Sequence, residues 1–547
     1  MMSKSKRILI CVLACAGAGL WGGFYPFTIA LWGGIFSALL VVLYRQKRAL
    51  YFPKNFSGYV MLILIACSVL SVCTAVDRGM ALIGVLRILV IGEFWLLWNN
   101  LDKEEREATF QAIPLAGVVW TVVSLVAYFL PVCRDFFYRA ERLGGPFQYS
   151  NTYALFLLVG IVILLASSEW NWKRMAETAF LFAGILMTGS RSVAVLAVVT
   201  LVYFFLTGKM GWKKKIGLIV GAAVFTVVLQ MLLRLDLGRL LRFTLESSTL
   251  NGRFLYWLDA LPVIFQHPLG LGYMGYFYVQ PQIQTGNYTT RFVHNELLQS
   301  ALDYGWIAAA VLILLLIYSL FHNSPRNRVI LLILAIHSLF DFDLQFSVMV
   351  CIGLMCVRQD ASASFQVRSS VVQAVIGLLG CVFLYFTVAF FAEYIGTYTL
   401  SLWLYPGNTT ARENLMYQEE NAIDQAKILI DSNGMLASAY EVMLRDASMQ
   451  GKYEDALNYE KQMLQCAGFE SYYYNQAVYY LSYALVAAIQ SGNEEASQEI
   501  VQEIFNIPER IRTEEDGASF FAYRINDQPE ITLEPEIEGF IRELKEN

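Results

Sequence analysis

The sequence predicts an all-α, polytopic membrane protein of about 13 transmembrane helices, followed by a soluble α-helical hairpin domain at the C-terminus. Three observations predict this class. The 547 residues are 57% hydrophobic and 16% charged, with a mean hydropathy of +0.49, whereas soluble globular chains are about half hydrophobic and about a quarter charged. Apolar runs long enough to cross a bilayer recur along the first 395 residues. The charge then changes sign, which marks the start of a different domain.

This change of charge divides the chain into two predicted domains, a transmembrane domain at 1–395 and an acidic, extracytoplasmic helical domain at 396–547. The second holds 10 Lys/Arg against 26 Asp/Glu, and the first holds 30 against 19. The overall net charge of −5 is therefore the sum of a basic first domain and an acidic second domain. It gives no reason to expect a nucleic-acid partner. The nine cysteines show neither a disulfide framework nor a metal-type spacing.

Each predicted span is an apolar run near the roughly 20 residues that a bilayer crossing requires. Together the runs account for the whole of the first domain except its loops. They fall near 8–23, 27–44, 57–76, 80–98, 109–131, 150–167, 174–189, 191–207, 215–233, 296–320, 328–341, 343–358 and 371–391.

The distribution of basic residues predicts the orientation. With the N-terminus inside, the loops on that side carry about 19 Lys/Arg against about 10 outside, as the positive-inside rule requires. Thirteen crossings then put the acidic domain outside, although the loss of one span would reverse its side. Two long loops, 132–149 and 234–294, lie outside, and the apolar and aromatic content of the second argues against disorder.

The acidic domain is predicted to consist of successive amphipathic helices. GKYEDA at 451–456 and GNEEA at 492–496 are similar to the turn and second-helix start of tetratricopeptide hairpins. An unrelated helical bundle fits the same residues. In either case the expected role is to hold a protein partner or an acceptor.

His294 is one of only four histidines and follows Arg291 at the end of the second outer loop. A neutral imidazole at a membrane interface can take a proton near pH 7, as activation of a sugar hydroxyl requires. The alternative is an interfacial histidine that caps a helix or is hydrogen-bonded within the fold.

Several arginines are predicted outside, against the general trend of the basic residues. Arg253 offers a planar fork of donors suited to phosphate, or it is a solvated surface arginine. Arg191 separates two spans with almost no loop, so it is held at the outer interface, where a charge is costly and usually has a role. Arg142 leads into the turn-rich approach to the sixth span. Such a group predicts a pocket for an anion, and a lipid pyrophosphate fits it because its charge stays at headgroup level.

His337 and Asp341 are four residues apart in the predicted span 328–341 and would share one helix face. They form either a hydrogen-bonded pair that orders the outer mouth or part of a metal site that lacks a third ligand. Arg87 and Glu93 are also intramembrane, but their spacing of six points them to different sides of a helix, so we expect each to have its own structural partner.

Taken in order, these motifs resemble the O-antigen ligase and polymerase superfamily of membrane glycosyltransferases. The resemblance runs from about residue 140 to 345, on alternating spans. Ala308 replaces a glycine of the family pattern, and the span at 371–391 and the acidic domain lie beyond the family core. The matching pieces are GGP at 144–146 through Asn151, GSR at 189–191, NGR at 251–253 through Trp257, PLGLG at 268–272, HN at 294–295 followed after nine residues by Gly305, and His337 with Asp341.

The resemblance implies a GT-C-like fold and a metal-independent, cofactor-free transfer of glycan from an undecaprenyl-pyrophosphate donor. The acceptor would be a saccharide, a lipid-linked glycan or a protein at the outer face of the bacterial cytoplasmic membrane. It also implies that Arg191 and Arg253 hold the pyrophosphate and that His294 acts on the acceptor. The residues expected to bind substrate are Arg142, Arg291, Asn295, Asn251, Asn151, Trp257, His337 and Asp341.

Two other functions fit a chain of this kind. A transporter or flippase for lipid-linked glycan would carry charged residues along the centres of its spans, whereas here they gather at the outer ends. A membrane-anchored scaffold acting through its helical tail would not need thirteen spans. Ligase and polymerase cannot be distinguished from the sequence, because both break the same bond and differ in the acceptor.

Overall fold

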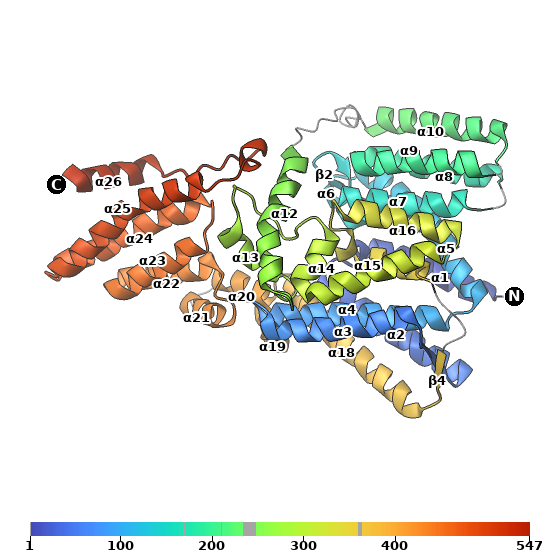
Figure 1. The fold of residues 1–547 in the computed structure, drawn as a ribbon, viewed down its shortest axis with the longest axis horizontal. Helices are drawn as coiled ribbons and strands as arrows, with labels where there is room; N and C mark the ends of the chain where they lie inside the picture. Colours follow the sequence, from blue (N-terminus) through green and yellow to red (C-terminus); the bar gives the residue numbers. More distant parts are fainter. Residues whose placement is uncertain are drawn as a thin grey trace.

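The computed structural model describes residues 2–167, 170–208, 210–233, 248–358, 364–418 and 421–546 (Figure 1). The membrane domain is a bundle of helices, and the C-terminal helices extend from one end of it, opposite the N-terminus. The helices of the first domain are α1 (Lys4–Gly19), α2 (Pro26–Lys47), α3 (Phe56–Thr74), α4 (Arg78–Asn100), α5 (Lys103–Tyr128), α6 (Pro131–Phe137), α7 (Ser150–Leu165), α8 (Trp172–Thr188), α9 (Arg191–Thr207), α10 (Trp212–Leu233), α12 (Ser248–Gln266), α13 (Gly275–Ile283), α14 (Glu296–Tyr304), α15 (Trp306–Phe321), α16 (Pro325–Ser338), α17 (Ser347–Cys356) and α18 (Ser370–Tyr394).

The remaining elements are the tail helices, short 3-10 turns and two small antiparallel sheets. Strand β1 pairs with β4, and β2 pairs with β3. The bounds are α19 (Tyr398–Leu404), α20 (Thr409–Met416), α21 (Ala422–Ser432), α22 (Ala437–Met449), α23 (Tyr453–Gln465), α24 (Ser471–Gln490), α25 (Glu494–Asp516), α26 (Pro535–Glu546), η1 (Trp21–Gly23), η2 (Gly145–Phe147), η3 (Asp343–Gln345), η4 (Ala522–Arg524), β1 (Leu50–Pro53), β2 (Tyr138–Arg139), β3 (Arg142–Leu143) and β4 (Ser364–Val367).

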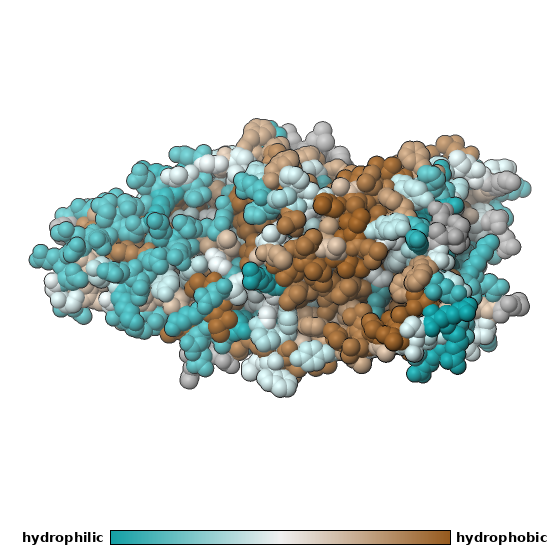
Figure 2. All heavy atoms as spheres, turned by 60° about the horizontal axis from the view of Figure 1, so that its bottom comes forward, coloured by the Kyte–Doolittle hydropathy of each residue, from teal (hydrophilic) through white to brown (hydrophobic). Residues whose placement is uncertain are grey.

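The all-α membrane class is confirmed. Each predicted span overlaps a helix, and among the described residues six helices, α2, α3, α4, α5, α10 and α18, are long and apolar enough to cross a bilayer. Helices α7, α9, α15 and α17 are apolar but shorter. Figure 2 shows hydrophobic residues gathered over the bundle beside the hydrophilic tail. The protein is therefore embedded in a membrane, while the number of crossings stays a prediction.

Within the predicted span 296–320, Gly305 separates α14 from α15. Gly305 has φ +88°, and a Cβ there would lie 2.4 Å from the carbonyl oxygen of Pro268. Only glycine fits this close approach without strain. Gly270 and Gly272 also have positive φ, so the backbone of the PLGLG segment follows a path that glycine favours.

The two long loops that are predicted to lie outside are ordered where they are described. Residues 132–149 contain most of α6, the β2–β3 hairpin and η2, and residues 248–294 contain α12 and α13. Residues 234–247 of the second loop lie outside the described residues. The expectation that the second loop is not disordered is confirmed for the part from 248 onward.

The tail contains helical hairpins that turn where the sequence predicts. Gly451 and Gly492 have φ of +68° and +69°, and helices α23 and α25 begin directly after these turns. The assignment to tetratricopeptide repeats stays a prediction. The tail is fastened to the membrane domain at Asp77, the N-cap of α4, which accepts hydrogen bonds from Thr409 and Asn433.

Candidate active site

Asp341 is the centre of a polar group at the end of the bundle nearest the tail. Helix α16 ends at Ser338, so Asp341 lies in the loop that follows it. Its side chain is only 1% exposed. Tyr149 Oη donates to Oδ1 at 2.7 Å, and Asn151 Nδ2 donates to Oδ2 at 2.7 Å. Segments far apart in the sequence therefore converge on one buried carboxylate.

Arg253 reaches this carboxylate from α12. Its Nη2 lies 3.2 Å from Oδ2 of Asp341, and its side chain is 15% exposed. On the same helix Trp257 donates from Nε1 to the carbonyl of Val293 at 3.0 Å. This bond ties α12 to the segment that carries His294, so Arg253 and the histidine are held together.

His294 lies on the other side of Asp341. Its Nδ1 is 3.5 Å from Oδ1 of Asp341, and its ring meets that of Phe342 edge-on. The backbone of His294 has φ +53°, an uncommon conformation for a residue other than glycine. Backbone strain of this kind persists only where surrounding contacts hold the residue in place, and strained residues often lie at functional sites.

Arg142 joins the group through Asn151. Its Nη2 donates to Oδ1 of Asn151 at 2.7 Å, and its Nε donates to the carbonyl of Thr188 at 2.8 Å. Arg142 follows the tight β2–β3 turn, in which Ala140 and Glu141 both have positive φ. The turn directs the guanidinium toward the junction of α8 and α9, where Arg191 begins the next helix.

The predicted pairing of His337 with Asp341 is wrong. Because α16 ends at Ser338, the two residues do not share a helix face. His337 Nδ1 instead meets Oδ2 of Asp343 at 2.5 Å, and its Nε2 lies 3.0 Å from the hydroxyl of Ser192. This second pair is almost fully buried and connects α16 to α9 beside Arg191.

The other predicted site residues have different surroundings. Arg191 is half-buried at the first position of α9, and Asn251 is buried near the start of α12. Asn295 caps α14, since its side chain accepts from the backbone of Leu297 and Leu298. Arg291 is exposed, and its guanidinium carbon lies 5.8 Å from the centre of the Phe277 ring. Arg291 is not among the described partners of Asp341.

The charges around Asp341 keep it ionised. Burial raises the pKa of this carboxyl, but His294, Arg253 and His337 outweigh that effect and hold the pKa well below its ordinary value. The site therefore contains a fixed negative charge between cationic or protonatable groups. Within the part of the chain that the structure describes, no three His, Cys, Asp or Glu residues are grouped to hold a metal ion.

Comparison with known families identifies the central part of this arrangement. Residues 176–313 match the family model described as O-antigen ligase. Over these residues the chain is similar to O-antigen ligases. The match includes Arg191, Arg253 and His294, and the O-antigen ligase family implies a glycosyl-transferring enzyme. No curated protein is significantly similar to the chain.

Sequence reasoning missed Tyr149 and Asp343, which support the ligase domain from outside the matched residues. Both stand within motifs whose other residues were singled out, beside Asn151 and Asp341. The sequence signal that could have identified them was a side-chain hydroxyl or carboxylate within a motif that already carried other candidate site residues. The intramembrane charges were predicted correctly, because Arg87 bonds Gln345 and Tyr273 while Glu93 accepts from Ser37.

Proposed function

We propose that this protein transfers a glycan from an undecaprenyl-pyrophosphate donor to an acceptor at the outer face of the bacterial cytoplasmic membrane. The observation that carries the proposal is the meeting of Arg253, His294 and Asn151 around the buried Asp341. The O-antigen ligase domain supports the reaction class. Helix α12, which carries Arg253, lies at the tail end of the bundle, opposite the N-terminus, and this supports the proposed side of the membrane (Figure 1).

In the proposed reaction, the acceptor hydroxyl or amine attacks the anomeric carbon of the donor sugar. The bond between that carbon and the pyrophosphate oxygen breaks, and the pyrophosphate leaves with the electron pair. Arg253 and Arg191 neutralise the charge that develops on it. Preorganised cations of this kind commonly contribute several kcal/mol to lowering a barrier, which is why we propose transfer without a metal ion or other cofactor.

His294 is proposed to take the proton from the acceptor. The Asp341 carboxylate beside Nδ1 favours the tautomer that carries its proton there, leaving the lone pair of Nε2 for the acceptor. Asp341 is thus a positioning residue for both His294 and Arg253. Asn151 holds Asp341 and is itself held by Arg142, and Asn251, Trp257 and His337 are proposed to shape the substrate site.

The proposal is tested by mass spectrometry of glycoconjugates from cells with and without the protein. We expect an unused lipid-pyrophosphate glycan to accumulate in its absence. Single repeat units on the carrier would indicate a polymerase, and full-length chains on the carrier would indicate a ligase. Donor that accumulates only on the inner face of the membrane would instead indicate a transporter and overturn the proposal.

A further inference from the structure

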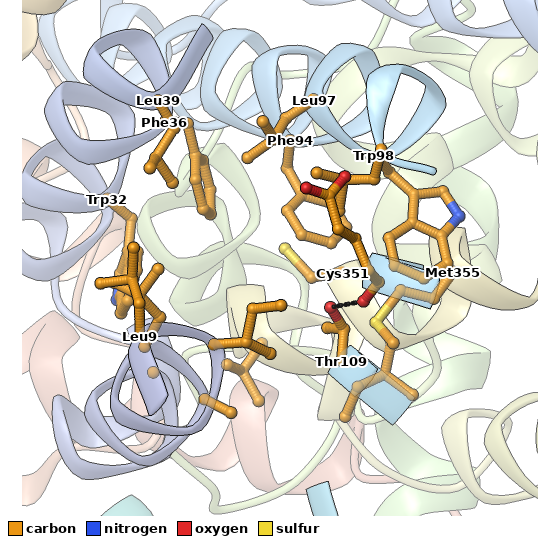
Figure 3. Close-up of a pocket in the computed structure, with 18 of the residues that line it drawn as sticks. Leu9, Trp32, Phe36, Leu39, Phe94, Leu97, Trp98, Thr109, Cys351 and Met355 are labelled. Atoms are coloured by element: carbon orange, nitrogen blue, oxygen red, sulfur yellow. Dashed lines mark hydrogen bonds between the residues drawn. The ribbon is translucent and has the colours of Figure 1, made fainter. Parts of the chain in front are cut away.

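A long apolar cavity lies inside the membrane domain, apart from the Asp341 group. Its volume is about 330 Å³, and helices α1, α2, α4, α5 and α17 supply most of its wall. Figure 3 shows the side chains of Trp32, Phe36, Phe94, Trp98 and Met355 arranged around the open space. The wall is therefore almost entirely hydrocarbon and aromatic, which suits an apolar chain.

The cavity has ionic groups at one end only. Lys6, Gln46 and Glu105 line that end, and Gly17 and Trp32 line the other. Along α1 the wall runs from Lys6 to Gly17, a length of about 16 Å at about 1.5 Å per residue. This is close to half of the roughly 30 Å hydrocarbon core of a bilayer. The length of the cavity along α1 therefore matches the hydrocarbon thickness of one leaflet.

The ionic end opens toward lipid. Leu9 on α1 and Val42 on α2 line the cavity and are nevertheless 49% and 48% exposed. A chain can therefore enter between these two helices from the surrounding membrane. The opposite end lies near Ser347, whose neighbour Phe346 packs on Tyr149 of the Asp341 group. The opening thus faces away from the proposed reaction.

The polar groups at the opening favour an anionic headgroup. Lys6 Nζ donates to Oε1 of Glu105 at 2.9 Å, while Oε2 of Glu105 accepts from the backbone of Asp102 at 2.9 Å in a capping box. Both carboxylate oxygens are engaged. An ammonium has three donors, so Lys6, whose side chain is 48% exposed, has donors beyond the one used by Glu105. The exposed amide of Gln46 adds another donor.

We propose that this cavity binds one acyl chain of a phospholipid from the leaflet on the N-terminal side, with the phosphate beside Lys6 and Gln46. The lipid fills the space between α1 and the α2–α4 pair and so supports the bundle from the side opposite the tail. This site is separate from any position of a polyprenyl donor whose pyrophosphate lies at the Asp341 group.

The test is native mass spectrometry of the purified full chain after detergent extraction and incubation with phosphatidylglycerol. We expect one retained phospholipid in the unaltered protein. Ala14→Phe, which fills the cavity, abolishes retention, and Lys6→Gln reduces it several-fold. The matched controls Val12→Phe and Lys4→Gln keep it, because Val12 is 56% exposed and neither residue lines the cavity.

Thermal unfolding of each variant identifies any variant that fails to fold. If Ala14→Phe does not fold, Lys6→Gln alone tests the proposal. Equal retention by the cavity variants and their controls would overturn the proposal. A retained polyprenyl lipid in place of phospholipid would also overturn it, as would loss of phospholipid in Arg253→Ala. Retention in Arg253→Ala supports a lipid site independent of the proposed glycan transfer.

Discussion

The carboxylate of Asp341 accepts hydrogen bonds from Tyr149, Asn151, Arg253 and the backbone of Phe342. Replacement by asparagine removes the negative charge that balances Arg253. It also places an amide NH2, which donates hydrogen bonds, against the groups that donate to the carboxylate. We expect Asp341→Asn to lower the transfer rate by on the order of 100-fold, because catalytic electrostatics of this kind contribute that much. Initial rates of the purified variant measure the effect.

The control for this change is Asp135→Asn, which alters an exposed carboxylate on α6. We expect it to leave the rate unchanged. A full rate in Asp341→Asn would show that the buried carboxylate has no part in positioning His294 and Arg253.

The residue types of the site were predictable, but their partners were not. Arg253, His294, Asn151 and Asp341 were found because polar side chains at the ends of apolar runs are costly and few. The pairing of His337 was missed because it depends on where α16 ends, which the apolar run did not fix. Arg291 lies next to the same motif as His294, yet its contact with Phe277 depends on tertiary packing.

Gly305 fixes how α14 joins α15 and therefore how Asn295 and the neighbouring His294 are presented. Gly305→Ala adds a Cβ 2.4 Å from the carbonyl of Pro268 at φ +88°. We expect a lower unfolding temperature, corresponding to about 1–3 kcal/mol for a residue forced into such a conformation. Thermal unfolding of the full chain measures it, with Gly377→Ala as control, since a Cβ at Gly377 meets nothing within 4 Å.

If Gly305→Ala unfolds at the same temperature as Gly377→Ala, the close approach to Pro268 does not constrain the chain. Helix positions were predictable at this scale because apolar runs are local signals. The reason for the break at Gly305 was not predictable, since it is a contact with a distant loop.

Helices α23 and α25 of the tail meet at Glu460, which is buried beside Arg510. Burial raises the pKa of Glu460 from 4.5 to about 8, although Arg510 acts against this. Because the folded state holds this proton more tightly than the unfolded state, its contribution to stability decreases as pH rises from about 4.5 to 8. We expect Glu460→Gln to slow hydrogen exchange in α23 and α25 at pH 6 and to slow it further at pH 9, where the unaltered chain has lost the whole contribution.

The comparison at each pH is between the unaltered chain and the variant, so the intrinsic pH dependence of exchange cancels. Glu499→Gln, on the same helix pair, is the control because Glu499 is exposed. A variant that protects these helices equally at pH 6 and pH 9 would contradict a raised pKa at Glu460.

The whole molecule has its acidic tail at one end and its N-terminus at the other (Figure 1). We expect a cysteine at Glu495, exposed at the start of α25, to react with a membrane-impermeant maleimide in intact cells. The matched variant Lys4→Cys, exposed at the N-terminus, reacts only after the membrane is opened. Native Cys466 is buried and is a poor reporter. Labelling of Lys4→Cys alone in intact cells would reverse the proposed orientation.

The division into a membrane domain and an acidic helical tail is a prediction that depends on composition and charge changing together at one point. The docking of the tail was not predictable, since it depends on contacts such as that between Asp77 and Thr409, which are more than three hundred residues apart. The apolar cavity was also invisible in the sequence, because the apolar residues of its wall are indistinguishable from ordinary span residues.

The most direct test of the proposed function is transfer by the purified full chain in lipid vesicles supplied with an undecaprenyl-pyrophosphate glycan and an acceptor. We predict that the unaltered protein forms the new glycoside, that Arg253→Ala and His294→Ala reduce its rate by at least on the order of 100-fold, and that Arg134→Ala does not. Arg134 is an outer-loop arginine that lies over the ring of Tyr128. Equal rates in all four proteins would contradict the assignment of catalysis to the group around Asp341.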